Sequence, residues 1–221
     1  AFPLSAYEFG DLVLVGEAGD VVHVGGTHEV AHVVQVVGGR YDLHYRHVAG
    51  NQIVPWNKDV AVASGIRVTQ DASVDVAIET IEIQIEALLD GQPFPASAYE
   101  RGDLTLLGAL PNDRIEVGST SAGAHTVRLA PGDYDLEYDH VAGSSIVPRN
   151  KHQLLATDLP FLRGGVRTID VATRVVAPSF LLNDAPFPTA PGQAGEIVLR
   201  GPGGGEPVSY THLRAHETPA N

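Results

Sequence analysis

Apolar and polar residues alternate along much of the chain with a period of two. In residues 81–86, IEIQIE, isoleucine alternates with glutamate or glutamine, which is typical of a strand with one buried face. The turn signal Asp90-Gly91 follows. No stretch carries a sustained 3.6-residue apolar period, so the pattern predicts almost no helix. Further strands are predicted at residues 104–107, 114–117, 125–129, 134–138, 152–156 and 166–171.

A segment of 18 residues occurs twice. Residues 41–58 read YDLHYRHVAGNQIVPWNK and residues 134–151 read YDLEYDHVAGSSIVPRNK, identical at 13 of 18 positions. The flanking sequence recurs too: Phe2-Pro3 returns as Phe94-Pro95 and again as Phe187-Pro188. The chain is therefore predicted to be all-β, built of tandem antiparallel β-sandwich repeats of about 93 residues.

The boundary between repeats is indicated by a change of register. Val74, Val76 and Ile78 share one face, but the next alternating series starts at Ile81, and one regular strand cannot hold both series. We therefore expect a first repeat at 1–79, a complete repeat at 80–172 and the start of a third at 173–205. Residues 206–221 form a tail that matches nothing in the repeat. Its segment 209–218, SYTHLRAHET, resembles translated sequencing-adapter read-through, and a native flexible tail is the alternative.

The first repeat begins at the position that matches Pro93, so it lacks a counterpart of the strand at residues 81–89. Residues 174–182, RVVAPSFLL, form a spare strand of the same kind. An incomplete sandwich exposes unpaired edges, and a strand from a neighbour could complete it. The candidate donor residues are Val175, Val176, Phe180, Leu181 and Leu182.

Charge and composition narrow the classes of function. The net charge is −13, with 14 Lys+Arg against 27 Asp+Glu, so nucleic acid and anionic membranes are not expected partners. No apolar run approaches the roughly 20 residues of a spanning helix. The chain has neither Cys nor Met, which excludes disulfides and thiolate metal sites. A first residue other than Met indicates a processed protein or a fragment.

Residues 28–32, HEVAH, match the zinc-protease motif H-E-x-x-H, which needs a helix to bring both histidines to one face. Here the motif runs into the strand-like residues 33–37, VVQVV, so no metal site is expected. Two histidines recur in the second repeat, His32 as His125 and His47 as His140. We expect these histidines to form structural hydrogen bonds at loops or strand ends.

Other candidate chemistry is equally sparse. Glu8 and Asp11 could hold Ca²⁺, but without a dense run of carboxylates a solvated acidic loop is favoured. A Lys–Asn isopeptide bond at Lys58 is disfavoured because its asparagine is the adjacent residue. With no Cys and no G-x-S-x-G elbow, catalytic residues, and with them an enzyme, are not expected. No cofactor is expected either. Trp56, the only Trp, is a candidate ligand platform.

The pattern L-x-P-G-x-Y-x-x-x-Y, carried by Leu129, Pro131, Gly132, Tyr134 and Tyr138, resembles transthyretin-like or carboxypeptidase-regulatory-like β-sandwiches. The fuller pattern with H-V-A-G-x-x-I-V-P-x-N resembles tandem repeats in secreted and surface proteins of environmental bacteria. The resemblance implies a prealbumin-like or Ig-like architecture for each repeat, an extracellular or cell-surface location, and a stalk, spacer or fibre role.

Two functions follow as hypotheses. The first is a non-enzymatic structural repeat protein whose partner is itself, either as a head-to-tail homopolymer or as neighbouring repeats of a longer chain. The alternative is a carbohydrate- or cell-wall-binding accessory module, in which Trp56 would stack on a sugar.

Overall fold

The computed structural model describes residues 7–143, 146–176, 181–186, 197–199 and 208–210. In these ranges the protein is all-β, as predicted, with a single turn of 3₁₀-helix at Thr120–Ala122. No helix in the described part of the chain is long and apolar enough to cross a membrane.

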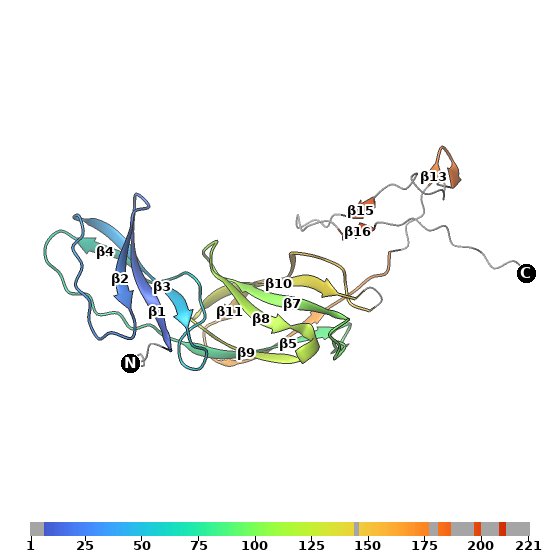
Figure 1. Cartoon of the computed structure of the whole chain (residues 1–221), viewed down its shortest axis with the longest axis horizontal. Coiled ribbons are helices and arrows are strands. Elements are labelled where there is room, and N and C mark those ends of the chain that lie inside the picture. Colours follow the sequence, from blue (N-terminus) through green and yellow to red (C-terminus); the bar gives the residue numbers. More distant parts are fainter. Residues whose placement is uncertain (1–6, 144–145, 177–180, 187–196, 200–207, 211–221) are drawn as a thin grey trace, which may run out of the picture.

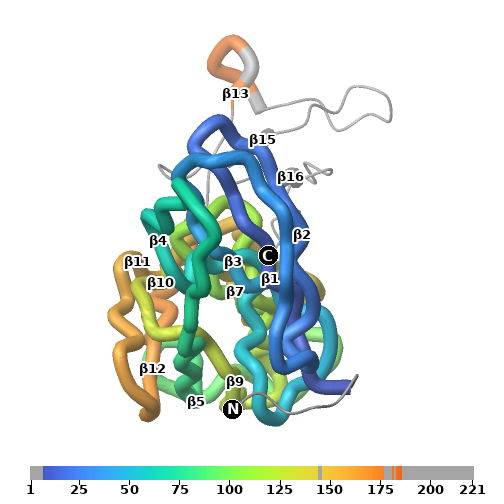
Figure 2. Tube along the Cα trace, turned by 90° about the vertical axis from the view of Figure 1, so that its left-hand side faces the viewer, coloured from blue at the N-terminus to red at the C-terminus, as the bar shows by residue number. Residues whose placement is uncertain are grey.

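The first 68 residues contribute one antiparallel sheet of four strands. It consists of β1 (Phe9–Gly16), β2 (Val21–Gly26), β3 (Gly39–Ala49) and β4 (Val60–Val68), in the order β2-β1-β3-β4. In Figure 1 this sheet lies beside the rest of the described strands, at the N-terminal end of the long axis. Figure 2 views the molecule from that end, with the first sheet nearest the viewer.

Residues 81–171 form a sandwich of two sheets. One sheet has the order β11-β10-β7-β8, and in the other β5 lies between β9 and β12 and also pairs with the short β6. The strands are β5 (Ile81–Leu89), β6 (Gln92–Pro93), β7 (Arg101–Leu107), β8 (Arg114–Ser119), β9 (Ala124–Leu129), β10 (Gly132–Ala142), β11 (Gln153–Phe161) and β12 (Gly165–Val171). These bounds confirm the strands predicted for this region.

One pairing departs from the predicted antiparallel pattern. β12 runs parallel to β5, with Gly165 opposite Ile83 and Val171 opposite Leu89. The strand before it, β11, belongs to the opposite sheet. Because β12 enters its sheet by crossing over rather than through a tight hairpin, its direction is not fixed by a turn.

The core of the sandwich lies between its two sheets. Ile83 and Ile85 of β5 and Val127 of β9 face Leu106 of β7 and Leu136 of β10, and all five are at most 1% exposed. Burying a side chain of this size stabilises a fold by roughly 1.5–3 kcal/mol. The alternation seen in residues 81–86 is thus the inward and outward face of the central strand.

The first sheet has the same strand order as the β7–β11 sheet, and its strands correspond to those strands with the 92–93-residue offset of the sequence repeat. A hydrogen bond from a buried tyrosine to the backbone of a proline further along the chain is also shared. Tyr45 donates a hydrogen bond from its hydroxyl to the Pro55 carbonyl at 3.0 Å, and Tyr138 does the same to Pro148 at 2.8 Å.

The first sheet has no second sheet over it in the described structure. Residues 31–37 and 72–80, which correspond to β9 and β12, are not strands. The predictions of strands at 33–37 and 74–78 were therefore wrong. Both segments would pair with a counterpart of β5, as β9 and β12 do. Without a strand to pair with, these segments form no β-sheet hydrogen bonds, even though their residues favour strands.

Burial shows the same difference between the two parts. Val127 and Leu129 of β9 are 0% exposed, whereas their counterparts Val34 and Val36 are only half-buried. The neighbouring Val33 is 97% exposed. The apolar face of the first sheet is therefore only partly covered.

After β12 the described chain contains two short hairpins. β13 (Leu181–Leu182) pairs with β14 (Ala185–Pro186), and β15 (Ile197–Leu199) pairs with β16 (Val208–Tyr210). The first hairpin repeats the β5–β6 pairing, in which Leu88 and Leu89 oppose Pro93 and Gln92.

Candidate functional site: the joint between the first sheet and the sandwich

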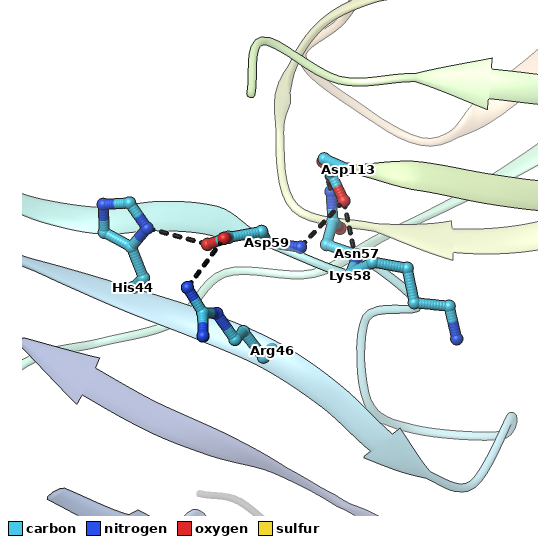
Figure 3. Close-up of polar contacts among 6 residues, drawn as sticks. All are labelled: His44, Arg46, Asn57, Lys58, Asp59 and Asp113. Atoms are coloured by element: carbon cyan, nitrogen blue, oxygen red, sulfur yellow. Dashed lines mark hydrogen bonds and ion pairs between the residues drawn. The ribbon is translucent and has the colours of Figure 1, made fainter. Parts of the chain in front are cut away.

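One loop makes a group of polar contacts between the two parts of the molecule. Residues 56–59 lie between β3 and β4 of the first sheet, at the end of the twice-occurring segment. Figure 3 shows Asn57, Lys58 and Asp59 of this loop beside Asp113, which lies in the turn between β7 and β8 of the sandwich. We call this contact the joint and residues 56–59 the first-unit loop.

Asn57 is the centre of the joint. Its side chain is fully buried, and its Nδ2 donates at 2.8 Å both to Oδ2 of Asp113 and to the hydroxyl of Tyr134. Its Oδ1 accepts from the backbone N–H of Ala130 at 2.8 Å. The Tyr134 hydroxyl in turn donates to the Ala130 carbonyl at 2.7 Å. A buried amide is retained here because its hydrogen-bonding groups find partners.

Asp113 binds the backbone of the same loop. Its Oδ1 accepts from the N–H of Lys58 at 2.6 Å and from the N–H of Asp59 at 3.2 Å. Burial raises the pKa of the Asp113 carboxyl, and the hydrogen bonds from Asn57, Asp59 and Lys58 offset this only in part. The Lys58 side chain points away from this carboxylate (Figure 3), so the lysine contributes its backbone rather than its charge.

An ion-paired cluster stabilises the loop from the side of the first sheet. Asp59 is 2.7 Å from Nδ1 of His44 and 2.9 Å from Nη2 of Arg46, both on β3 (Figure 3). The carboxylate is buried, and a buried charge is tolerated when it is paired and hydrogen-bonded. The ion pairs of Asp59 therefore hold the first-unit loop against β3 while Asn57 contacts the sandwich.

The sandwich, which is the second unit of the repeat, contains a corresponding cluster in which the acidic residue and the histidine have exchanged positions. Glu137 stands at the position of His44 and His152 at that of Asp59, with 3.3 Å between Oε1 and Nδ1. Glu137, Asp139 and His152 form a group whose ligand atoms could hold a metal ion. Arg114 is already paired with the Glu137 carboxylate, so we interpret this cluster as a set of ion pairs that holds residues 149–152, the counterpart of the first-unit loop.

Trp56 lies at the edge of the joint. It packs against the core of the sandwich, and its backbone N–H donates to the Arg128 carbonyl at 2.8 Å. Its indole Nε1 is buried without a partner among the described residues. Trp56 also lines an open hollow, whose other lining residues are Asn51, Gln52, Glu82, Thr126 and Arg128.

The recurring histidines form structural hydrogen bonds, as predicted. Nε2 of His47 lies 2.6 Å from the Gly50 carbonyl, and Nε2 of His140 lies 2.8 Å from the Gly143 carbonyl. His125 contacts the Ser119 carbonyl in the same way at 2.7 Å. These interactions hold the loops that follow β3 and β10 and the turn before β9.

The H-E-x-x-H segment forms a turn after β2 rather than a helix. Nε2 of His32 lies 3.1 Å from the Gly26 carbonyl, and its Nδ1 lies 3.2 Å from Glu29. His28 packs its ring edge-on against Phe9 at 4.6 Å between centroids. Neither histidine belongs to a three-ligand group in the described part of the chain.

Glu8 binds backbone amides rather than standing free in an acidic loop. Its carboxylate accepts from the N–H groups of Asn51, Gln52 and Ile53 at 3.1–3.4 Å. Desolvation raises the pKa of Glu8, but these hydrogen bonds outweigh it, so the pKa lies below its usual value. Glu100 caps the corresponding loop of the second unit through Ile146.

The candidate donor residues are placed only in part. Val175 and Val176 are 98% and 64% exposed, Leu181 is exposed, and Leu182 belongs to β13. Phe180 lies outside the described residues. The donor-strand role of these residues stays a prediction.

Sequence reasoning missed the joint. The available signal was the recurrence of Asn57 as Asn150, each the second residue after a proline, and recurrence alone does not tell what the asparagine contacts. Asp113 recurs as Asp20 in the same way, but aspartate is common in turns, so its recurrence alone indicates no contact.

Comparison with known proteins adds little to this picture. No family model matches the chain, and no curated protein matches it. Among solved structures, it is similar to the Bacillus anthracis TIE protein with a TM-score of 0.28 and 11% identity, over 75% of this chain and 30% of that chain. The chain thus spans less than a third of that protein's length.

Proposed function

We propose that this protein is a non-enzymatic structural repeat protein that associates head to tail with copies of itself. The observation that carries the proposal is the first sheet, whose two flanking segments lie without the central strand that β5 provides in the sandwich. An open sheet with exposed valines favours association with a further strand.

The occupant we propose is residues 174–182 of a second copy. With the offset of the repeat, Val176 takes the place of Ile83, which is buried in the sandwich, and Val175 takes the place of the exposed Glu82. Pro178 takes the place of Ile85 and lacks a backbone N–H, so this strand pairs less completely than β5.

Strand donation of this kind is heterologous, because the donating and receiving surfaces differ. Such contacts build open filaments unless the rotation closes a ring. Neighbouring repeats of a longer chain could supply the same strand covalently. Both arrangements make a linear array, which suits a stalk or fibre subunit.

The side chains that could perform chemistry support a structural role. The recurring histidines and Glu8 hold loops, and Asp59 and Glu137 are ion-paired. The location outside the cell or on its surface rests on the resemblance to repeats of secreted and surface proteins.

Electron microscopy of matched variants tests the proposal. The full chain should form filaments, and both deletion of residues 174–221 and the substitution Val176→Asp should abolish them. Val175→Asp is the control, since its counterpart in β5 is already acidic and exposed. Filaments that survive the deletion, or a full chain that forms none at any concentration, would contradict strand donation.

The second candidate is binding of a carbohydrate or cell-wall glycan. The observation in its favour is the hollow in which Trp56 stands beside amide and charged side chains, a combination that suits a sugar ring and its hydroxyls. Glycan-array binding that is lost in Trp56→Ala would support it, and an array without any bound glycan would speak against it.

A further inference from the structure

The joint has two halves, and each unit carries a counterpart of both. The first unit supplies its loop, with Asn57, to a receiving end on the sandwich made by Asp113, Ala130 and Tyr134. The repeat places Asn150 on the second unit at the position of Asn57, and Asp20 on the first unit at that of Asp113.

The receiving end is already formed on the first sheet. The N–H of Gly16 donates to the Asp20 carbonyl at 2.8 Å, as the N–H of Gly108 does to Asp113 at 2.7 Å. A Cβ added to Gly16 would lie 2.2 Å from an Asp20 carboxylate oxygen, and one added to Gly108 would lie 2.1 Å from that of Asp113. The two carboxylates therefore sit over their glycines in the same way.

The tyrosine of the receiving end is in place as well. The hydroxyl of Tyr41 donates to the Val37 carbonyl at 2.7 Å, which reproduces the bond from Tyr134 to Ala130. The difference lies in what covers the two ends. Val37 is 83% exposed whereas Ala130 is 6% exposed, and a hollow lined by Gly38, Gly39, Arg40 and Arg67 borders this end of the first sheet.

Residues 149–152, the counterpart of the first-unit loop on the sandwich, share one backbone hydrogen bond with it. The N–H of His140 donates to the Asn150 carbonyl at 2.8 Å, as that of His47 does to Asn57. The Asn150 carboxamide is half-buried and makes a 3.4 Å hydrogen bond to Oε1 of Gln153. Within the described residues it makes none of the contacts that bury Asn57.

We propose that residues 149–152 of one copy dock on the Asp20 end of a second copy and rebuild the joint there. Asn150 would donate to the Asp20 carboxylate and the Tyr41 hydroxyl and accept from the N–H of Val37. The Asp20 carboxylate would also accept from the N–H of Lys151, whereas the N–H of His152 already donates to the Asp139 carboxylate at 2.7 Å. This inference rests on the head-to-tail association proposed above and names its polar contact.

Chain geometry lets this loop and the donated strand reach one neighbour. Within one chain, residues 57–81 connect two contacts with the same sandwich. At their start Asn57 binds Asp113, and at their end β5 begins as the central strand of one sheet. The same number of residues separates Asn150 from Arg174 as separates Asn57 from Ile81. A copy that donates residues 174–182 to a first sheet therefore brings its Asn150 loop to the Asp20 end of that sheet.

Sedimentation velocity of the full chain over a concentration series tests the joint. Asn150→Ala and Asp20→Ala should each weaken self-association by roughly 30-fold or more, since each leaves buried polar groups without partners. Lys151→Ala is the matched control, because the loop uses the backbone at this position, and it should associate as the unaltered chain does. Thermal unfolding of the dilute variants checks that each one is folded.

The outcomes separate this inference from the proposed function. If Val176→Asp abolishes association while Asn150→Ala and Asp20→Ala leave it unchanged, strand donation holds and the joint is refuted. If the two joint variants weaken association and Val176→Asp does not, the joint holds without a donated strand. A full chain that stays monomeric at every concentration overturns both.

Discussion

Replacing Asn57 by alanine should uncouple the first sheet from the sandwich, whereas replacing Asn150 by alanine should have little effect in the dilute chain. The two residues occupy the same position in the repeat and keep the same backbone bond to a β-strand histidine. They differ in their surroundings, because the Asn57 side chain is fully buried and bonded to the sandwich. The pair is therefore a matched comparison.

The magnitude follows from the groups that lose their partners. Asn57→Ala removes hydrogen bonds to Asp113, Tyr134 and Ala130. A buried donor or acceptor left unsatisfied costs about 1–3 kcal/mol, and one hydrogen bond here is made to a charged group. With compensation by water at the edge, we expect about 3–5 kcal/mol for Asn57→Ala. For Asn150→Ala, which loses one long bond, we expect less than about 1 kcal/mol.

Trp56 provides the assay. It is the only tryptophan and it packs against the sandwich beside the joint, so its fluorescence reports contact between the two parts. In urea titrations of dilute protein, Asn57→Ala should shift the Trp56 transition to lower urea while circular dichroism of the sandwich changes less. In Asn150→Ala both signals should stay together, as in the unaltered chain.

Equal losses in the two variants would refute this reasoning, because they would assign the cost to the loop itself rather than to the joint. An Asn57→Ala variant whose Trp56 transition is unchanged would do the same.

Three further predictions concern single side chains. Burial raises the pKa of Asp113, so the folded state binds the proton of this carboxyl more tightly than the unfolded state does. The stability of the unaltered chain relative to Asp113→Asn should therefore fall as the pH rises from about 4. Urea unfolding at a series of pH values measures this difference. Tyr134→Phe should cost about 1–2 kcal/mol, and Tyr41→Phe, whose hydroxyl has no asparagine partner among the described residues, should cost less; equal values would contradict the joint. Gly102→Ala puts a Cβ 2.2 Å from the buried tyrosine ring on β10 and should lower the melting temperature by an amount equivalent to about 1–3 kcal/mol, whereas Gly132→Ala, with its nearest contact at 3.5 Å, should be nearly neutral.

The strands of the sandwich could be predicted because their signal is local. The alternation of residues 81–86 specifies an inward and an outward face wherever the strand lies, and Ile83 and Ile85 are buried as it requires. The parallel pairing of β5 with β12 could not be predicted, because direction depends on how the chain crosses between sheets.

The strand predicted at residues 33–37 failed to form because its formation depends on a partner strand and not only on local sequence. VVQVV has strong β-propensity, yet propensity describes how well side chains fit a sheet that already exists. Residues 1–79 contain no counterpart of β5, yet strands were still expected at the two segments that correspond to β9 and β12. The joint escaped prediction because it depends on the relative placement of two units, which no period along the chain encodes.

Amide hydrogen exchange of residues 31–37 and 72–80 at increasing protein concentration tests the central claim most directly. These segments correspond to β9 and β12, which pair with β5 in the sandwich, so strand donation should protect their amides as association proceeds. Protection should rise with concentration in the full chain and in Val175→Asp but not in Val176→Asp. Exchange of these amides at the same rate at every concentration would contradict the claim that a second copy completes the first sheet.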